Sequence, residues 1–271
     1  KPVFAEKAIQ VNAPIHFAEK EQFLLESSIN EQGKRIYQTK EYADLEGELS
    51  GLCQIKNTNT LLSAIRILQD KGYNINDTHV RKGFAQVCSL TGLMGRWQKL
   101  QDSPATYCDT GHNKAGIQYI VEQLSRQTYH QLHIVMGMVN DKDISGVLAM
   151  LPKDAIYYFT KASVSRALNE NEVKRLAGEA GLEGNTYPSV KDAFEANDAM
   201  NQAVGHARGE FVIFMNCGDL FYSKDVLAKA NEEKTGDKLA GLAAETAQER
   251  VAAKVVLAAV TLHDLRENPA V

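Results

Sequence analysis

The run from residue 109 to residue 113 combines side chains that can bind a nucleotide. It places Asp109 and His112 between an apolar stretch that reads as a strand and an amphipathic stretch that reads as a helix. The backbone N–H groups that open a helix attract anions. Asp109 can hold a ribose hydroxyl and His112 a phosphate oxygen. The plainer interpretation is that Asp109 and Asn113 cap the helix.

The elements around this run alternate between strand and helix. Strands are expected at residues 106–108, 132–136, 155–159 and 211–215, and helices at residues 114–127, 144–151, 170–180 and 191–207. Such alternation produces a parallel sheet with right-handed crossovers, and ligands bind at the carboxyl ends of its strands. We therefore expect a Rossmann-like α/β domain with a mostly parallel sheet flanked by helices over residues 94–225.

The stretches on either side of this domain have different patterns. Residues 1–93 contain strand-like runs at residues 2–4 and 13–17, a turn at Gly33, and helices at residues 60–71 and 76–88, the second capped by Asn76 or Asp77. Residues 226–271 are rich in alanine and other good helix formers. We expect part of an α/β domain before residue 94 and a helical tail after residue 225.

Composition excludes several classes of protein. The 271 residues allow a sizeable core. A formal net charge of −4 lacks the basic footprint that nucleic acids and anionic membranes require. No run approaches the ~20 apolar residues of a membrane span, and no signal-peptide pattern opens the chain, so we expect a cytoplasmic protein. The four cysteines form no CxxC pair, which predicts free thiols.

Four motifs follow one another along residues 1–196. They are the helix start at residues 53–58, the Gly-Arg-x-Gln turn at residues 95–98 with the Asp-x-x-His-Asn run at residues 109–113, and the loops at residues 137–143 and 161–167. Together they resemble the bifunctional dihydrofolate synthase/folylpolyglutamate synthase family. That family shares its fold with the Mur ligases, so the resemblance implies a carboxy-terminal domain of the Mur ligase type, preceded by a remnant of the central domain.

The resemblance implies an amide ligase. Enzymes of this family use ATP to turn a carboxylic acid into an acyl phosphate, which an incoming amine displaces; folate and glutamate are the implied substrates, and ATP and Mg²⁺ the implied cofactors. The resemblance assigns the adenine to Asn57, the phosphates to Arg96, the ribose to Asp109, the neighbourhood of the phosphates to His112, and the substrate to Lys142 and Arg166. An arginine suits this task because its guanidinium binds phosphate in a bidentate fork. The alternatives are a surface salt bridge for Arg96 and a solvated charge for Lys142.

One part of the family pattern is missing from the printed sequence. The first domain of these ligases has a glycine-rich loop that ends in Gly-Lys-Ser/Thr and cradles ATP. No such run occurs in the sequence. We therefore expect that a missing N-terminal ATPase domain is a required partner, and that this polypeptide alone has little or no ligase activity.

The resemblance changes after residue 196. Residues 198–203 and 207–219 resemble the family 2 glycosyltransferases, in which the aspartate that matches Asp219 helps to bind a metal; a helix cap is the alternative. Residues 226–271 resemble the N-terminus of the ethanolamine ammonia-lyase large subunit, with an amphipathic helix without chemistry as the alternative. Three unrelated resemblances in succession indicate a recombined or engineered chimera. The run at residues 211–215 is nevertheless of the type that completes the sheet.

Three functions are therefore weighed against one another. The leading prediction is a fragment of a folate-type amide ligase that keeps half of an ATP site. A non-catalytic α/β scaffold or chimera is the second, and a glycosyltransferase the third. ATP binding that is lost with Arg96→Ala or His112→Ala favours the first, and no nucleotide binding favours the second. Metal-dependent binding of a nucleotide sugar, lost with Asp219→Asn, favours the third.

Overall fold

The computed structural model describes residues 2–102, 104–140, 143–161, 165–193, 196 and 210–216. Within these residues the chain forms two compact units, each with its own core. The first unit comprises the described residues up to 48 and residues 54–91. The second comprises residues 49–53 and the described residues from 92 onward. No helix among the described residues is long and apolar enough to cross a membrane.

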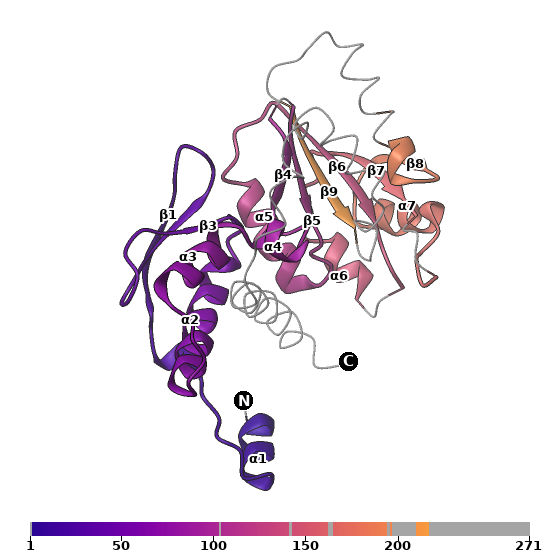
Figure 1. Ribbon diagram of the computed structural model, residues 1–271. Helices are drawn as coiled ribbons and strands as arrows, with labels where there is room; N and C mark the ends of the chain where they lie inside the picture. Colours follow the sequence, from indigo (N-terminus) through magenta and orange to yellow (C-terminus); the bar gives the residue numbers. More distant parts are fainter. Residues whose placement is uncertain are drawn as a thin grey trace. The chain divides into compact units, whose positions relative to one another are not determined.

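The first unit combines a small antiparallel sheet with helices (Figure 1). The sheet has the order β1 (Leu24–Ile29), β2 (Arg35–Thr39), β3 (Leu45–Gly47). The helical elements of the unit are α1 (Pro2–Gln10), η1 (Ala18–Lys20), α2 (Gln54–Asp70), α3 (Asp77–Ala85) and α4 (Val87–Thr91). Gly33 has a φ of 76° in the turn between β1 and β2, which confirms the predicted turn. Leu61 and Leu62 are buried on α2, and Tyr37 and Leu45 are buried on the sheet.

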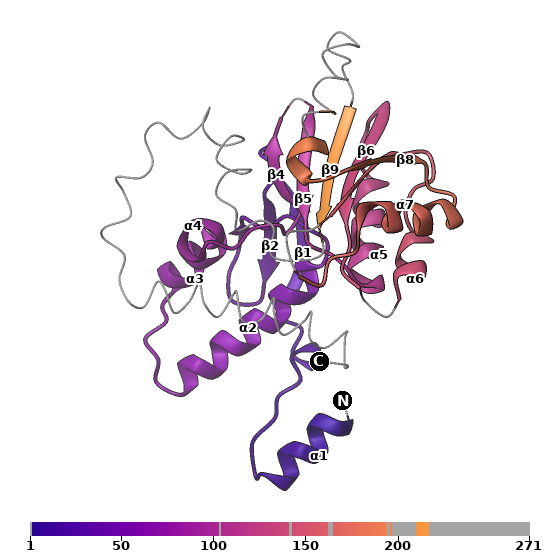
Figure 2. The same cartoon turned by 90° about the vertical axis from the view of Figure 1, so that its right-hand side faces the viewer.

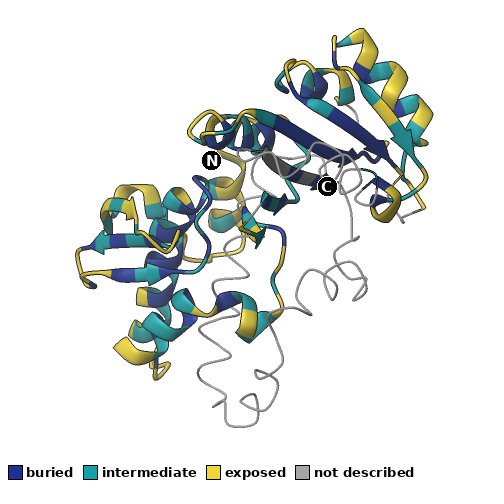
Figure 3. Cartoon of the chain, turned by 90° about the horizontal axis from the view of Figure 1, so that it is seen from above, coloured by how far each residue is buried: buried dark blue, intermediate teal, exposed yellow. Residues whose placement is uncertain are grey.

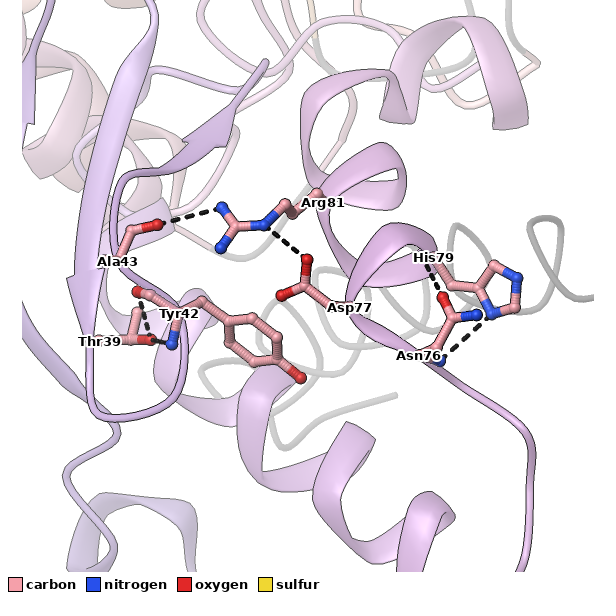
Figure 4. Close-up of polar contacts among 7 residues, drawn as sticks. All are labelled: Thr39, Tyr42, Ala43, Asn76, Asp77, His79 and Arg81. Atoms are coloured by element: carbon pink, nitrogen blue, oxygen red, sulfur yellow. Dashed lines mark hydrogen bonds and ion pairs between the residues drawn. The ribbon is translucent and has the colours of Figure 1, made fainter.

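The start of α3 is tied to the loop between β2 and β3 (Figure 4). The Asn76 side chain accepts a hydrogen bond from the His79 backbone at 3.0 Å, and the Asn76 backbone donates to His79 Nδ1 at 3.3 Å. This reciprocal cap confirms Asn76 as the N-cap of α3. Arg81 Nε pairs with Asp77 at 2.8 Å, and its Nη1 donates to the Ala43 carbonyl at 3.0 Å, so this arginine joins helix and loop.

Three expectations for the first unit are wrong. Residues 2–4, expected as a strand, belong to α1, because proline is favoured in the first turn of a helix. Residues 13–17 form no strand, and Pro14 has no N–H to donate to a neighbouring strand. The helix expected at residues 76–88 is two helices, separated at Gln86, whose φ of −135° is not helical. The strands β1, β2 and β3 are not predicted by the sequence pattern.

The second unit is built on a six-stranded sheet with the order β4-β5-β9-β6-β7-β8. The strands are β4 (Gln98–Gln101), β5 (Ala105–Asp109), β6 (Gln131–Gly137), β7 (Ile156–Thr160), β8 (Gly184–Tyr187) and β9 (Glu210–Asn216). All neighbouring strands are parallel except β4, which pairs with β5 in the antiparallel sense. The expected mostly parallel, Rossmann-like sheet is confirmed.

Three helices cover one face of this sheet (Figure 2). They are α5 (Lys114–Leu124), α6 (Ile144–Leu148) and α7 (Glu170–Glu179). Ile117 of α5, Leu148 of α6 and Val173 of α7 share one apolar cluster with Ile134 and Phe159 of the central strands. Burial of this apolar surface, at roughly 25 cal/mol per Å², is the main force that holds the helices on the sheet.

The opposite face of the sheet has a smaller core. Cys108, Val135 and Tyr158 lie on this face and pack with Val190 and Ala193. Strands buried on both faces read as continuous apolar runs, which is why the sequence predicts β6 and β7 correctly, and Figure 3 shows buried residues along the strands. The helix expected at residues 191–207 lies mostly outside the described residues.

The strand β9 lies between β5 and β6, although it is the last strand in the sequence. Met215 pairs with Asp109 on one side and with Met136 on the other. The side chains of Ile213 and Met215 are buried in the main core. This strand comes from the stretch that resembles the glycosyltransferases, and the expectation that it completes the sheet is confirmed.

Candidate functional site

The candidate site lies at the edge of the sheet where the parallel strands end. Asp109 is the last residue of β5, and residues 110–113 lead directly into α5. Gly137 and Thr160, which are paired in the sheet, end β6 and β7 at the same edge. In open parallel sheets, ligands bind at this edge. The run singled out in the sequence therefore occupies the position where a ligand is expected.

Asn113 is the N-cap residue of α5. Its side-chain oxygen accepts a hydrogen bond from the Gly116 backbone at 2.8 Å. A Cβ atom on Gly116 would lie 3.3 Å from the Gly111 Cα, and one on Gly111 would lie 2.7 Å from a methyl carbon of Ile120. The two glycines thus allow the loop to pack tightly on the first turn of the helix. Of the two caps proposed from the sequence, Asn113 is confirmed.

Asp109 joins two separate segments. One carboxylate oxygen accepts a hydrogen bond from the Gly111 backbone at 2.8 Å, and the other accepts one from the Trp97 backbone at 2.7 Å. Asn113 occupies the N-cap position of α5, so the interpretation of Asp109 as that cap is wrong. The carboxylate instead connects the loop before α5 with a turn twelve residues earlier in the chain.

That turn carries Arg96. Gly95 and Trp97 have positive φ values of 69° and 51°. The Gly95 backbone donates to the Gln98 side chain at 3.0 Å, and the Gly95 carbonyl accepts from the Thr110 backbone at 2.9 Å and from its hydroxyl at 3.2 Å. The turn is therefore closed on itself and bound to the loop that follows β5.

The residue after Arg96 is packed against β5. Trp97 is buried, and its ring lies 5.0 Å from the ring of Tyr107 on β5. Arg96 itself is half-buried, and its Nη1 donates to the Gly95 carbonyl at 3.4 Å. A guanidinium held at the carboxyl end of β5 supplies several donors in a planar fork for an anion.

His112 is oriented by the loop to which it belongs. Its Nδ1 lies 3.1 Å from the Thr110 carbonyl oxygen. A carbonyl can only accept, so Nδ1 carries the proton of this hydrogen bond. In the neutral ring Nε2 is then an acceptor, and it donates to a phosphate oxygen only when the ring is charged.

A further cation lies at the start of α5. Lys114, the first residue of the helix, pairs with Asp143 at 2.7 Å. Asp143 is the N-cap of α6 and accepts from the Gly146 backbone at 3.2 Å. The hydrogen bond from Lys114 is the main cause that lowers the pKa of Asp143. The pair ties the loop after β6 to the beginning of α5.

Of the three cysteines that the structure describes, Cys108 and Cys88 have raised thiol pKa values, which do not suit a nucleophile. Cys108 is fully buried in β5; burial raises the pKa of its thiol well above the ordinary value, with Asp109 adding to the effect and Arg96 opposing it. Cys53 and Cys88 are also free thiols, and burial raises the pKa of Cys88 to about 12. The expectation of free thiols is confirmed for these three, while Cys217 lies outside the described residues.

The other residues that the sequence analysis assigned to the nucleotide, the substrate or a metal are distant in sequence from the turn that carries Arg96. Asn57 is on α2 of the first unit and is 3% exposed; its amide donates to Gln54 at 3.1 Å, and its oxygen has no partner among the described residues. Arg166 is exposed in the segment after β7, where its carbonyl accepts from the Asn140 backbone at 3.0 Å. Lys142 and Asp219 lie outside the described residues.

Two features of the site are not foreseen from the sequence. The pattern assigns no role to Thr110 or Gln98, although both hold the turn that carries Arg96. The available signal was the spacing of Gln98 in the Gly-Arg-x-Gln motif.

Within the part of the chain that is described, no group of three or more His, Cys, Asp or Glu residues is arranged to hold a metal ion. The described residues therefore do not by themselves fit a Mg²⁺ site.

Comparison with known proteins agrees with this geometry. Residues 95–215 match the model of the family described as Mur ligase, glutamate ligase domain. The dihydrofolate synthase/folylpolyglutamate synthase of Escherichia coli (strain K12) is 25% identical over 204 residues, which are 73% of this chain and 44% of that protein. A solved structure of Mycobacterium tuberculosis folylpolyglutamate synthase, complexed with ADP and AMPPCP, superposes with a TM-score of 0.67 at 22% identity, covering 87% of this chain and 52% of that one.

A different relative matches the end of the chain. Residues 220–271 match the family model of the ethanolamine ammonia lyase large subunit. The large subunit of Escherichia coli (strain K12) is 60% identical over 48 residues, which are 18% of this chain and 11% of that protein. Matches to unrelated proteins on two successive stretches support the expectation of a recombined chain.

These matches confirm the resemblance to the Mur ligase glutamate ligase domain and its α/β fold. The chain spans about half the length of the folate synthases that it matches. None of these matches supports the resemblance of residues 197–225 to a glycosyltransferase. The ligase match at residues 95–215 covers most of that stretch.

Proposed function

We propose that residues 95–215 are the carboxy-terminal domain of an ATP-dependent amide ligase that adds glutamate to a folate through an acyl phosphate. In this proposal the domain contributes one half of the ATP site. The observation that carries it is the arrangement at the end of β5, where the Arg96 turn is hydrogen-bonded to the loop that opens α5. The sequence match of this stretch to a glutamate ligase domain supports the same conclusion.

The proposed roles follow from the chemistry of each group. Arg96 binds the phosphates and offsets the negative charge that builds up during phosphoryl transfer, which depends mainly on positioning and charge. The N-terminus of α5 adds its partial positive charge. His112 lies in the same loop, where its charged form donates to a phosphate oxygen.

The adenine is proposed to bind Asn57. This assignment rests on the resemblance alone. Arg166 and Lys142 are proposed to bind the substrate. When bound, ATP supplies the phosphoryl group that activates the acid; the residues named here bind and orient it.

The remaining half of the site is proposed to come from a partner domain. A domain with a Gly-Lys-Ser/Thr loop would cradle the ATP phosphates from the other side and supply the Mg²⁺ site. We expect the chain on its own to bind ATP weakly and to turn over little or no folate in the presence of Mg²⁺ and glutamate. Normal turnover by the isolated chain would contradict this part of the proposal.

The proposal is tested by calorimetric titration of the chain with ATP. We expect weak binding that is lost with Arg96→Ala and weakened with His112→Ala. Arg175→Ala is the matched control, because Arg175 is an exposed arginine of the same unit that pairs with Glu172 and Glu179 on α7. Absence of binding by the unaltered chain, or equal loss in the control, favours the alternative of a non-catalytic α/β scaffold.

A further inference from the structure

The turn that carries Arg96 has an unusual backbone. Trp97 has a φ of 51°, in the left-handed region that residues other than glycine seldom adopt. Gly95, two residues earlier, has a φ of 69° and can adopt it without strain. A strained residue keeps such a conformation only when its surroundings hold it there. Arg96 lies between the two, so whatever holds this turn also fixes the backbone from which the Arg96 side chain extends.

Asp109 holds the strained residue directly. Its carboxylate accepts the backbone N–H of Trp97 at 2.7 Å, and a hydrogen bond to an ionised acceptor is stronger than one between neutral groups. The other oxygen accepts the N–H of Gly111 at 2.8 Å, which anchors the carboxylate to the loop before α5. Thr110 strengthens the same connection through the Gly95 carbonyl.

We propose that Asp109 is a positioning residue, which holds the turn that carries Arg96 and so affects the binding of the nucleotide phosphates through Arg96. This inference rests on the proposed function. The resemblance to the folate ligases assigns Asp109 to the ribose, and the two roles make different predictions. A ribose ligand matters only for ligands that contain a ribose, whereas a residue that positions Arg96 matters for every ligand that contains the phosphates.

The test compares two ligands that differ in this respect. ATP and inorganic tripolyphosphate are titrated into the unaltered chain and into Asp109→Asn, which has nearly the same shape but cannot accept both N–H groups. Positioning predicts that tripolyphosphate weakens as well as ATP, by about tenfold, since one hydrogen bond to a charged group is lost. Asp102→Asn is the matched control, because Asp102 is exposed and pairs with Lys99 in the same unit; it should change neither affinity.

A second, milder variant keeps the inference testable if Asp109→Asn does not fold. Thr110→Val removes the hydroxyl that donates to the Gly95 carbonyl at 3.2 Å but keeps the backbone bond to the same atom. It should weaken ATP and tripolyphosphate by equal and smaller factors. A loss of ATP affinity in Asp109→Asn without any loss of tripolyphosphate affinity overturns the inference and assigns Asp109 to the ribose.

Backbone hydrogen exchange separates this inference from the proposed function. Asp109→Asn should raise the exchange rates of the Trp97 and Gly111 amides, and Asp102→Asn should not. If the unaltered chain binds neither ligand, the proposed function is wrong and the inference falls with it. If it binds both, and Asp109→Asn raises exchange at Trp97 without weakening either ligand, only the positioning role is overturned.

Discussion

Asn113 offers a way to separate the stability of α5 from its ability to bind an anion. Its side-chain oxygen accepts the Gly116 N–H at 2.8 Å, so Asn113→Ala removes an N-cap. Loss of such a cap costs typically about 1 kcal/mol. Asn113→Asp keeps the acceptor and adds a negative charge at the helix N-terminus, which stabilises a helix by about 0.3–1 kcal/mol. The alanine variant should therefore be less stable than the unaltered chain, and the aspartate variant at least as stable.

Nucleotide binding should follow a different order. A carboxylate at residue 113 would repel a phosphate bound at the start of α5. Two like charges about 6 Å apart repel by roughly 0.7 kcal/mol in water and by roughly 3 kcal/mol near a protein surface, where the effective dielectric constant is about 20. These limits correspond to a loss of ATP affinity of about three-fold to about a hundred-fold. Asn113→Asp should thus combine unimpaired stability with weakened binding.

The assay uses the sole tryptophan of the chain. Trp97 is 5% exposed in the same unit as α5, so its emission reports the unfolding of this unit in urea. With a denaturant slope of about 2 kcal/mol per M, the loss of the cap lowers the midpoint by about 0.5 M. ATP affinity is measured on the same samples by calorimetry.

A matched substitution controls for the added charge. Asn169 is the N-cap of α7 in the same unit and accepts from the Asn171 backbone at 3.0 Å. Asn169→Asp should leave stability and ATP affinity unchanged or raise stability slightly. The reasoning is refuted if Asn113→Asp binds ATP as tightly as the unaltered chain, or if Asn169→Asp weakens binding equally.

Three further predictions concern stability. Burial lowers the pKa of His133, which lies 3.0 Å from the Tyr158 hydroxyl, so the unfolded chain takes up a proton that the folded chain resists. This contribution to stability is complete above about pH 6.5 and is lost as the pH falls through the lowered pKa of the folded state. In urea titrations from pH 7.5 to 5, the free energy of unfolding should fall less for His133→Asn than for the unaltered chain. Equal falls would contradict this role of His133. Gly184→Ala should cost about 2–3 kcal/mol, because the new Cβ would lie 2.1 Å from the Tyr157 carbonyl oxygen, and a urea midpoint unchanged from that of the unaltered chain would disprove the close packing. Asn76→Ala should cost about 1 kcal/mol and raise the exchange of the first amides of α3 about fivefold, whereas full protection would show that the cap does not hold the helix.

The parts of the fold that were predictable are those with a strong local pattern. Apart from His133, residues 132–136 and 155–159 are apolar or aromatic because β6 and β7 are buried on both faces, and their order with α5, α6 and α7 implies a parallel sheet. The edge strands β4 and β8 are short and polar, so their conformation depends on the neighbour with which they pair. The local sequence contains no information about that neighbour.

The same distinction applies to the site. The loop from Asp109 to Asn113 and its position before a helix were predictable from residue types, and so was the cap at Asn113. The bond between Asp109 and the backbone of Trp97 was not, because it joins residues twelve positions apart through a turn whose backbone no pattern of side chains predicts. The buried amide oxygen of Asn57, which has no partner within the described part of the chain, likewise becomes visible only when α2 is packed.

The central claim is that nucleotide phosphates bind where the Arg96 turn meets the start of α5. It is tested most directly by titrating isotope-labelled chain with ATP and following the backbone amide resonances. We predict that the largest changes occur at Arg96, Trp97 and residues 111–116, and that they are absent in Arg96→Ala. Changes centred on another part of the chain, or none at millimolar ATP, would contradict the claim.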